Sequence, residues 1–216
     1  MPIGDHLRDV MDLYGSPKCP HTNAVLIAAG EKGVDINSHV EDDWGPSSSI
    51  RSMSPLGIGP VLKDRSAVNI GVVSCMSYLD DKGFGPSLVH RNGVTRARMF
   101  QEITIAQQTD CSDDAALAAA LDQLEATLNS PLGNMKGDYC VGQYTLADCA
   151  WAGVCQVATN MGKGTAVSSR SAVNTWFAAV QSHPSTSKEA INPFSCLSTK
   201  ADHDGNTMRD VRINTA

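Results

Sequence analysis

The clearest structural pattern lies in residues 10–40, which read VMDLYGSPKCPHTNAVLIAAGEKGVDINSHV. Residues 10–14 form a short run typical of a β-strand, and the Gly-Ser-Pro turn that follows ends it. Apolar residues with helical spacing come next, and Gly33 stands where a left-handed residue often ends a helix. Residues 34–40 are a second strand-like run. The pattern predicts a β-α-β unit with parallel strands and a right-handed crossover.

Two more short strand-like runs follow this unit. Residues 41–59 are rich in Ser, Pro and Gly, which predicts an irregular connection with about one helical turn. Residues 60–63 and 67–70 are separated by three residues, a spacing that favours a β-hairpin. Residues 71–81 have a helical pattern. The order βαβ then ββα predicts a small mixed sheet covered by helices.

The rest of the chain is predicted to be helical. Helical patterns cover residues 94–108, 113–129, 146–161 and 171–182. The second of these has a leucine stripe and either Ser112 or Asp113 as its N-cap. The third begins with Thr145 and Asp148 in the S/T-x-x-D spacing of a capping box. We expect Trp151 and Trp176 to be core residues.

The pattern changes suggest four segments. We expect a first domain at residues 10–82, a linker at 83–93 and an all-helical domain at 94–195. The last stretch, 196–216, is polar and is expected to be a tail.

Composition limits the class of protein. The 216 residues are 42% hydrophobic and 19% charged, which is typical of a folded globular chain. A net charge of -6 argues against a nucleic-acid or anionic-membrane partner. No apolar run is long enough for a membrane helix, and the start lacks a signal-peptide pattern, so we expect a cytoplasmic protein. Seven cysteines without a CxxC pair predict neither a disulfide framework nor a metal site.

Four segments, taken in order, match the pattern of one known family. They are LYGSPKCP (13–20) with AVLIAAGEKGV (24–34), SPLGIGPVL (54–62), GQYTLAD (142–148), and Trp176 with His183-Pro184. Together they resemble the cytosolic glutathione transferase superfamily. The resemblance implies an α/β plus all-α fold, with a thioredoxin-like N-terminal domain (βαβ-ββα) followed by an all-helical C-terminal domain. It also implies glutathione as co-substrate and a possible homodimer.

Cys19 is the strongest catalytic candidate. It precedes Pro20 at the expected first turn of a helix, where unpaired backbone N–H groups and a partial positive charge favour the thiolate. The Cys-Pro pair most resembles the omega and dehydroascorbate-reductase classes of the family. Ser16 and Tyr14 are rival hydroxyl groups, because other classes use a hydroxyl from this region. His21 is expected to be a solvated residue facing elsewhere on the helix.

Two further positions bear on glutathione binding. If the bond before Pro60 is cis, Gly59 can pair its backbone with a peptide-like substrate. The family has an acidic residue followed by Ser at the start of the third helix, where this chain has Gly71 and Val72. Neither side chain can make those hydrogen bonds, although backbone N–H groups at a helix start can meet a carboxylate.

Two hypotheses therefore stand. The first is a glutathione transferase-like enzyme in which Cys19 transfers a thiol or conjugates glutathione to a small electrophile. The second is a non-catalytic module that docks partner proteins, which the Gly71-Val72 pair favours. A hydrophobic substrate cleft would lie near residues 94–108, where four residues share a helical face, although packing between domains explains them equally well. These four residues are Met99, Phe100, Ile103 and Gln107.

Overall fold

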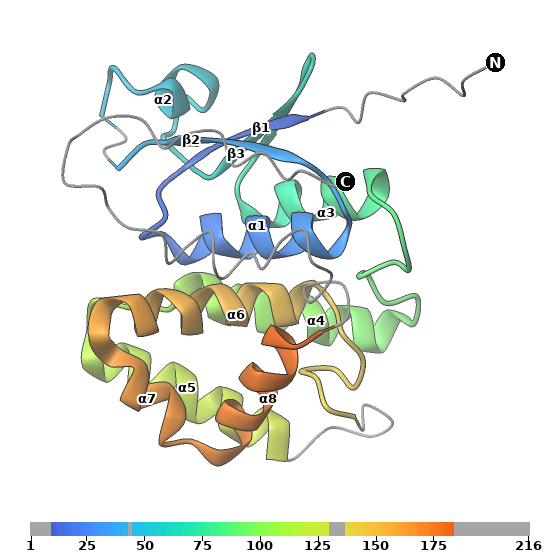
Figure 1. Ribbon diagram of the computed structural model, residues 1–216, viewed down its shortest axis with the longest axis vertical. Helices are drawn as coiled ribbons and strands as arrows, with labels where there is room; N and C mark the ends of the chain where they lie inside the picture. Colours follow the sequence, from blue (N-terminus) through green and yellow to red (C-terminus); the bar gives the residue numbers. More distant parts are fainter. Residues whose placement is uncertain (1–9, 43–44, 130–136, 184–216) are drawn as a thin grey trace.

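A four-stranded mixed sheet forms the first part of the computed structural model, which describes residues 10–42, 45–129 and 137–183 (Figure 1). The strands are β1 (Met11–Gly15), β2 (Ile36–Val40), β3 (Val61–Asp64) and β4 (Ala67–Ile70). Their order in the sheet is β2-β1-β3-β4, with β1 and β2 parallel and the other pairs antiparallel. The predicted βαβ-ββα order is confirmed.

Three helices accompany the sheet: α1 (Pro20–Glu31), α2 (Ser49–Met53) and α3 (Val72–Lys82). The apolar residues predicted on the first helix are buried, because α1 lies between the sheet and α6 of the second part of the chain (Figure 1). Gly33, with φ 60°, follows the end of α1 as the sequence predicted. In β1, Leu13 is buried and its neighbours Asp12 and Tyr14 are partly exposed.

The second part of the described chain is helical. Its helices are α4 (Gly93–Gln108), α5 (Asp114–Asn129), α6 (Leu146–Ala158), α7 (Gly164–Ser168) and α8 (Ser171–Gln181). The expected helix over residues 146–161 is shorter in the structure, because a π-helical turn, η1 (Thr159–Lys163), interrupts it at Gly162 with φ 80°. The short helix α7 was not predicted. It follows directly from this break.

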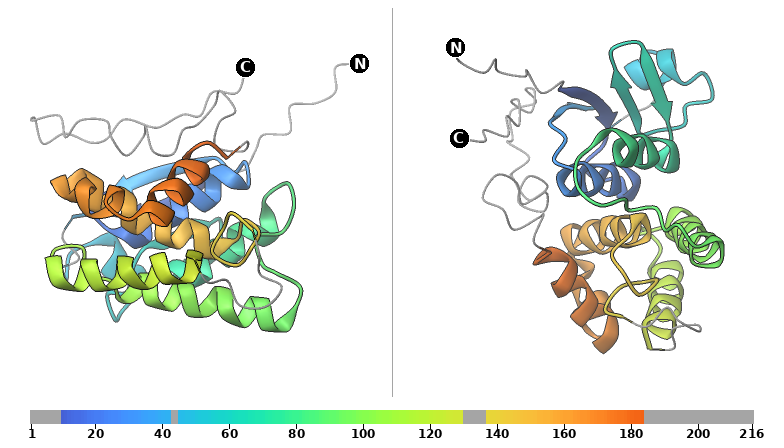
Figure 2. Two further views of the ribbon diagram at one scale, coloured as in Figure 1. Left: turned by 90° about the horizontal axis from the view of Figure 1, so that it is seen from below. Right: turned by 90° about the vertical axis from the view of Figure 1, so that its right-hand side faces the viewer.

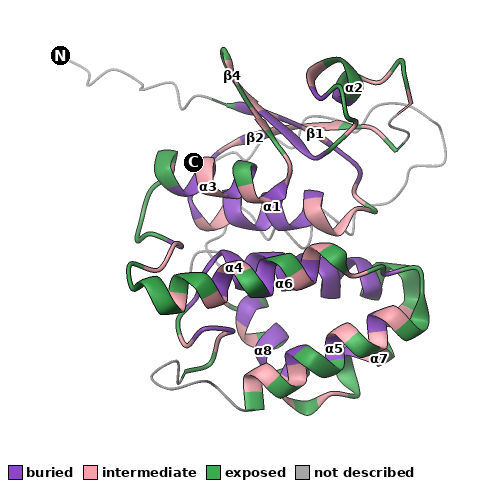
Figure 3. Ribbon diagram, turned by 180° about the vertical axis from the view of Figure 1, so that it is seen from behind, coloured by how far each residue is buried: buried purple, intermediate pink, exposed green. Residues whose placement is uncertain are grey.

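Helices α1 and α6 hold the two parts together. In Figure 1 and in the right-hand view of Figure 2, α1 lies between the sheet and α6. Every residue of α6 is buried, and Figure 3 shows both helices mostly in the buried colour. Gly153 permits this close packing, since a Cβ atom there would lie 2.4 Å from the carbonyl oxygen of Pro20.

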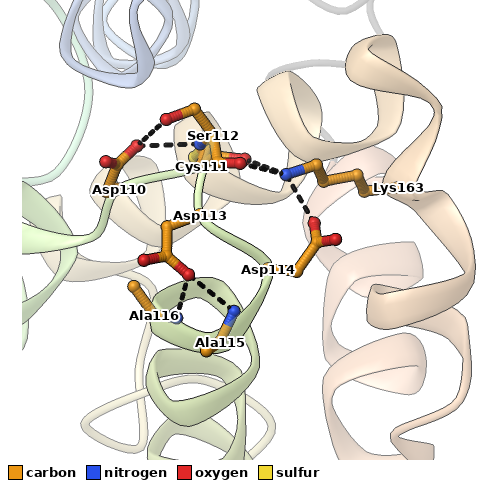
Figure 4. A network of polar contacts seen from close by, with 8 residues as sticks. All are labelled: Asp110, Cys111, Ser112, Asp113, Asp114, Ala115, Ala116 and Lys163. Atoms are coloured by element: carbon orange, nitrogen blue, oxygen red, sulfur yellow. Dashed lines mark hydrogen bonds and ion pairs between the residues drawn. The ribbon is translucent and has the colours of Figure 1, made fainter.

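Both predicted helix caps are present. Asp113 accepts hydrogen bonds from the backbone N–H groups of Ala115 and Ala116, so it is the N-cap of α5 (Figure 4). Asp148 accepts from the N–H of Thr145 at 2.8 Å, which completes the capping box at the start of α6.

The same carboxylate also organises the helical part. The Asp148 Oδ1 atom accepts from the N–H of Cys140 at 2.9 Å and from the indole of Trp176 at 2.8 Å. Trp151 and Trp176 are both buried, as predicted. None of the helices in the described ranges is long and apolar enough to cross a membrane. The predicted tail at 196–216 and residues 184–195 lie outside the described residues.

Candidate functional site

Three predicted site segments meet at one end of the sheet. Tyr14 in β1 pairs with Val61 in β3, so the end of β1 lies beside the start of β3. The Gly59–Pro60 peptide bond is cis, and Pro60 immediately precedes β3. The carbonyl of Pro60 accepts a hydrogen bond from the N–H of Gly71 at 2.8 Å, which brings the start of α3 to the same place. The loop that carries Cys19 follows β1 directly.

Cys19 is the N-cap residue of α1. Its backbone is extended, with φ -93° and ψ 122°, and Pro20 occupies the first helical position. Its N–H donates to the carbonyl of Ser16 at 3.0 Å. The side-chain amide of Asn23 donates to the carbonyls of Pro17 and Cys19, both at 2.8 Å, and so fixes the loop against the helix. The residue as a whole is partly exposed.

The surroundings of Cys19 favour its thiolate form. Burial alone raises the pKa of this thiol, but hydrogen bonding from the His21 imidazole and from the backbone N–H of Thr22 outweighs it. The pKa of Cys19 therefore lies below the ordinary value for a cysteine thiol. The neighbouring sulfur in turn raises the pKa of His21, which burial opposes.

The prediction for His21 was wrong. This side chain was expected in solvent and facing away from Cys19, but the imidazole is half-buried and its Nε2 atom lies 3.1 Å from the carbonyl oxygen of Gln107 in α4. The spacing rule used for the prediction applies inside a helix, whereas Cys19 is an extended cap residue outside it. The backbone carbonyl of Gln107, which is distant in sequence, then fixes the orientation of the imidazole ring.

The pKa values of the other described cysteines are shifted in the opposite direction. Burial raises their pKa values, to about 12 for Cys75 and about 11 for Cys111. The three remaining thiols have pKa values well above the ordinary range for the same reason; they are Cys140, Cys149 and Cys155. These five are buried, and Cys196 lies outside the described residues.

The two rival hydroxyl groups have other contacts. Ser16 is buried, and its hydroxyl donates to the carboxylate of Asp42 while accepting from the N–H of Lys18 at 3.1 Å. The Lys18 ammonium also lies 3.1 Å from Asp42, so these groups tie the loop together. The ring of Tyr14 stacks on His39 of β2 with the centroids 4.4 Å apart.

The start of α3 offers backbone groups. Gly71 is its N-cap with φ 82°, and Val72 is buried. Neither side chain can hydrogen-bond, and the Gly71 N–H already donates to Pro60. Within the described ranges, no cluster of His, Cys, Asp and Glu side chains could hold a metal ion.

The predicted face of α4 is divided in the structure. Met99 and Ile103 are completely buried in the core, so packing explains them. Gln107 contributes its carbonyl to His21. Phe100 instead lines an open groove of about 440 Å³ on another side of the helix. The groove is lined by Ala97, Arg98, Phe100, Gln101, Thr104 and Ile105.

Two bacterial proteins illustrate the sequence likeness, and no family model matches the chain. The chain is 33% identical over 91 residues to the stringent starvation protein A homolog of Coxiella burnetii, covering 42% of this chain and 44% of that protein. It is 27% identical over 152 residues to the Pasteurella multocida homolog, covering 66% of this chain and 72% of that protein. The aligned segment thus spans less than half of the first of these relatives.

Solved structures resemble the chain over most of its length. A Nilaparvata lugens delta-class glutathione transferase has a TM-score of 0.68 at 23% identity, over 87% of this chain and 99% of that one. A Methylobacterium extorquens maleylacetoacetate isomerase with bound malonate and glutathione has a TM-score of 0.70 at 16% identity, over 86% and 95% of the chains. Likenesses at these identities establish a shared fold.

Proposed function

We propose that this chain, which has the fold of the glutathione transferase superfamily, uses Cys19 as the nucleophile of a thiol-transfer reaction on small disulfides. The observation that carries the proposal is the contrast among the thiols. The pKa of Cys19 is lowered beside His21 and the α1 N-terminus, whereas the pKa values of the other five described cysteines are raised. A lowered pKa raises the fraction of Cys19 that is thiolate at neutral pH, and the thiolate is the reactive form.

The first step is an exchange at sulfur. The Cys19 thiolate attacks the glutathione sulfur of a disulfide between glutathione and another thiol, which breaks that bond and forms a bond from Cys19 to glutathione. The other thiol leaves as a thiolate and takes a proton. Cys19 raises the pKa of His21, which favours the protonated imidazole, so this side chain is placed to supply that proton.

The second step restores the enzyme. A second glutathione thiolate attacks the glutathione sulfur bonded to Cys19, and oxidised glutathione leaves with the Cys19 thiolate regenerated. Gly71 and Val72 lack the side-chain groups that hold the γ-glutamyl end in the family, which removes a contact of roughly 1.5–3 kcal/mol. That loss lowers affinity about ten- to a hundredfold. We therefore expect glutathione to bind weakly, through backbone groups.

Alkylation of Cys19 by iodoacetamide as a function of pH tests the proposal. The parent protein carries Cys196→Ser, so that the labelled position is Cys19. We expect a labelling midpoint below that of an ordinary cysteine. His21→Ala should move the midpoint to higher pH, because the imidazole that stabilises the thiolate is gone. His39→Ala is the matched control, since His39 stacks on Tyr14, and it should leave the midpoint unchanged.

An ordinary midpoint that does not respond to His21→Ala would contradict the proposal. A second measurement follows the adduct directly. After exposure to oxidised glutathione, intact mass should detect a glutathione adduct or its disulfide product in the parent, and Cys19→Ser should form neither. The six described cysteines are all free thiols, which suits the reducing cytoplasm that we propose as the compartment.

A second candidate function is docking of a protein partner or a second copy of the chain. It is favoured by apolar side chains exposed between α2 and α3, of which Leu56 is 79% exposed. Ile58, Val68 and Ile70 are also exposed, and Ile58 lies close to Gly71. Exposed apolar patches mark interaction surfaces. Sedimentation of the parent and of Leu56→Asp tests it: a dimer that the substitution dissociates supports a homodimer, and a monomer in both excludes one.

A further inference from the structure

A second cysteine lies close to the site. Cys111 is in the connection between α4 and α5, and its thiol is buried with Sγ 3.9 Å from the carbonyl oxygen of Val154 in α6. The ammonium of Lys163 holds this connection by donating to the carbonyls of Cys111 and Ser112 at 2.8 and 2.7 Å (Figure 4). The same ammonium lies 2.6 Å from Asp114 at the start of α5.

Three contacts bring this connection to the N-terminus of α1. His21 contacts the carbonyl of Gln107, four residues before Cys111. Pro20 packs on Gly153, and Cys111 contacts the adjacent residue Val154. The residue after Cys19 and the Cys111 thiol therefore contact consecutive residues of one helix. The charge of Cys19 is also one of the influences that raise the pKa of Cys111, as expected for neighbouring sulfurs.

We propose that Cys111 is the resolving thiol of Cys19, forming a reversible intramolecular disulfide with it. This rests on the proposed function, because Cys19 must first become bonded to glutathione. The Cys111 sulfur, having lost its proton to solvent, attacks the Cys19 sulfur of the mixed disulfide. The bond between Cys19 and glutathione breaks, the Cys19–Cys111 bond forms, and glutathione leaves as a thiolate. External thiols later reduce the disulfide.

The charges and burial around the two thiols favour reaction of Cys19 before Cys111. Burial is the largest influence that raises the pKa of Cys111, the charges of Asp110 and Cys19 add to it, and Lys163 opposes it. The thiol is therefore protonated and unreactive in the resting protein. Once Cys19 is part of a mixed disulfide, its negative charge is absent and one cause of the raised pKa is removed. Burial remains the largest influence on the pKa of Cys111, so the thiol becomes slightly easier to ionise when its target exists.

The test uses the full chain with Cys196→Ser, reduced and then treated with oxidised glutathione. In the parent we expect peptide mapping to find Cys19 linked to Cys111, and intact mass to find the protein two hydrogen atoms lighter with no adduct. A disulfide requires Cα atoms within about 7 Å, so the linked peptide also reports that the two segments approach. Cys111→Ser should instead accumulate the glutathione adduct on Cys19.

Cys155→Ala is the matched control, because Cys155 is a buried thiol of α6 close to Cys111, and it should behave as the parent does. Equal adduct in the parent and in Cys111→Ser, or a link from Cys19 to another cysteine, would overturn the resolving role while leaving the nucleophile in place. Absence of both adduct and disulfide in every protein would overturn the nucleophile as well. Mapping of the parent decides the matter even if Cys111→Ser does not fold.

Discussion

Replacing Gly153 with Ala tests how the two parts of the molecule are held together. The added Cβ atom would lie 2.4 Å from the carbonyl oxygen of Pro20 and 2.9 Å from the nitrogen of Ala24. Both are backbone atoms of α1, so no side-chain rotation relieves the overlap, and α1 and α6 must move apart. Overpacking of this severity costs about 3 kcal/mol. The higher helix propensity of Ala returns about 1 kcal/mol, which leaves a net loss of about 2 kcal/mol.

Urea unfolding measures this loss as a lower midpoint at unchanged slope. Gly164→Ala is the matched control, since the nearest atom to its Cβ, in Thr159, is 3.5 Å away and in ordinary contact. That variant should be as stable as the parent or up to about 1 kcal/mol more stable. The displaced carbonyl belongs to the residue after Cys19, so Gly153→Ala should also change the pH midpoint of Cys19 alkylation. A Gly153→Ala protein as stable as the parent would refute the close packing of α1 on α6.

Two further predictions concern buried carboxylates. Burial raises the pKa of Glu31 from 4.5 to about 7. Between these pH values the folded protein keeps a proton on Glu31 that the unfolded chain has released. The free energy of unfolding should therefore fall as the pH rises from about 4.5 to about 7. Urea unfolding at several pH values should record a fall of up to about 3 kcal/mol in the free energy of unfolding, and Glu31→Gln should abolish this fall. The same pH dependence in Glu31→Gln as in the parent would contradict the raised pKa of Glu31. Asp148→Ala should cost about 3 kcal/mol or more in the same assay, because the donors of Cys140, Thr145 and Trp176 each lose a buried acceptor worth about 1–3 kcal/mol. A loss below about 1 kcal/mol would indicate that these donors find other partners.

The parts of the fold that depend on local pattern could be predicted. The strand-like run in residues 10–14, the helical spacing after Pro20 and the left-handed glycine at position 33 each specify local geometry, and together they predicted the βαβ unit that the structure contains. The caps at Asp113 and Thr145 were equally local, because a cap needs only the residues that follow it. The helical patterns from residue 94 onward gave the order of the two parts, and the resemblance to the glutathione transferase superfamily implied the same order.

The features that were missed depend on contacts distant in sequence. His21 is fixed by the carbonyl of Gln107, which no pattern around residue 21 reveals. The break after α6 follows from the left-handed conformation of Gly162. Glycine adopts left-handed and right-handed conformations almost equally readily, so its presence in the sequence does not predict such a break. In the sequence, nothing distinguishes Cys111 from the other cysteines that lie among apolar residues. Its position near Cys19 results from the packing of α4 and α6 against α1.

The groups that activate Cys19 are separate from those that would hold glutathione. The thiolate is favoured by His21 and by the first N–H groups of α1, with the imidazole fixed from α4. Gly71 and Val72 stand at the start of α3 and contribute nothing to that arrangement. Reactivity and glutathione affinity can therefore vary independently in this fold. For the function that we propose, we therefore expect substrates recognised through their reactive sulfur to be preferred over those recognised through the glutathione tripeptide.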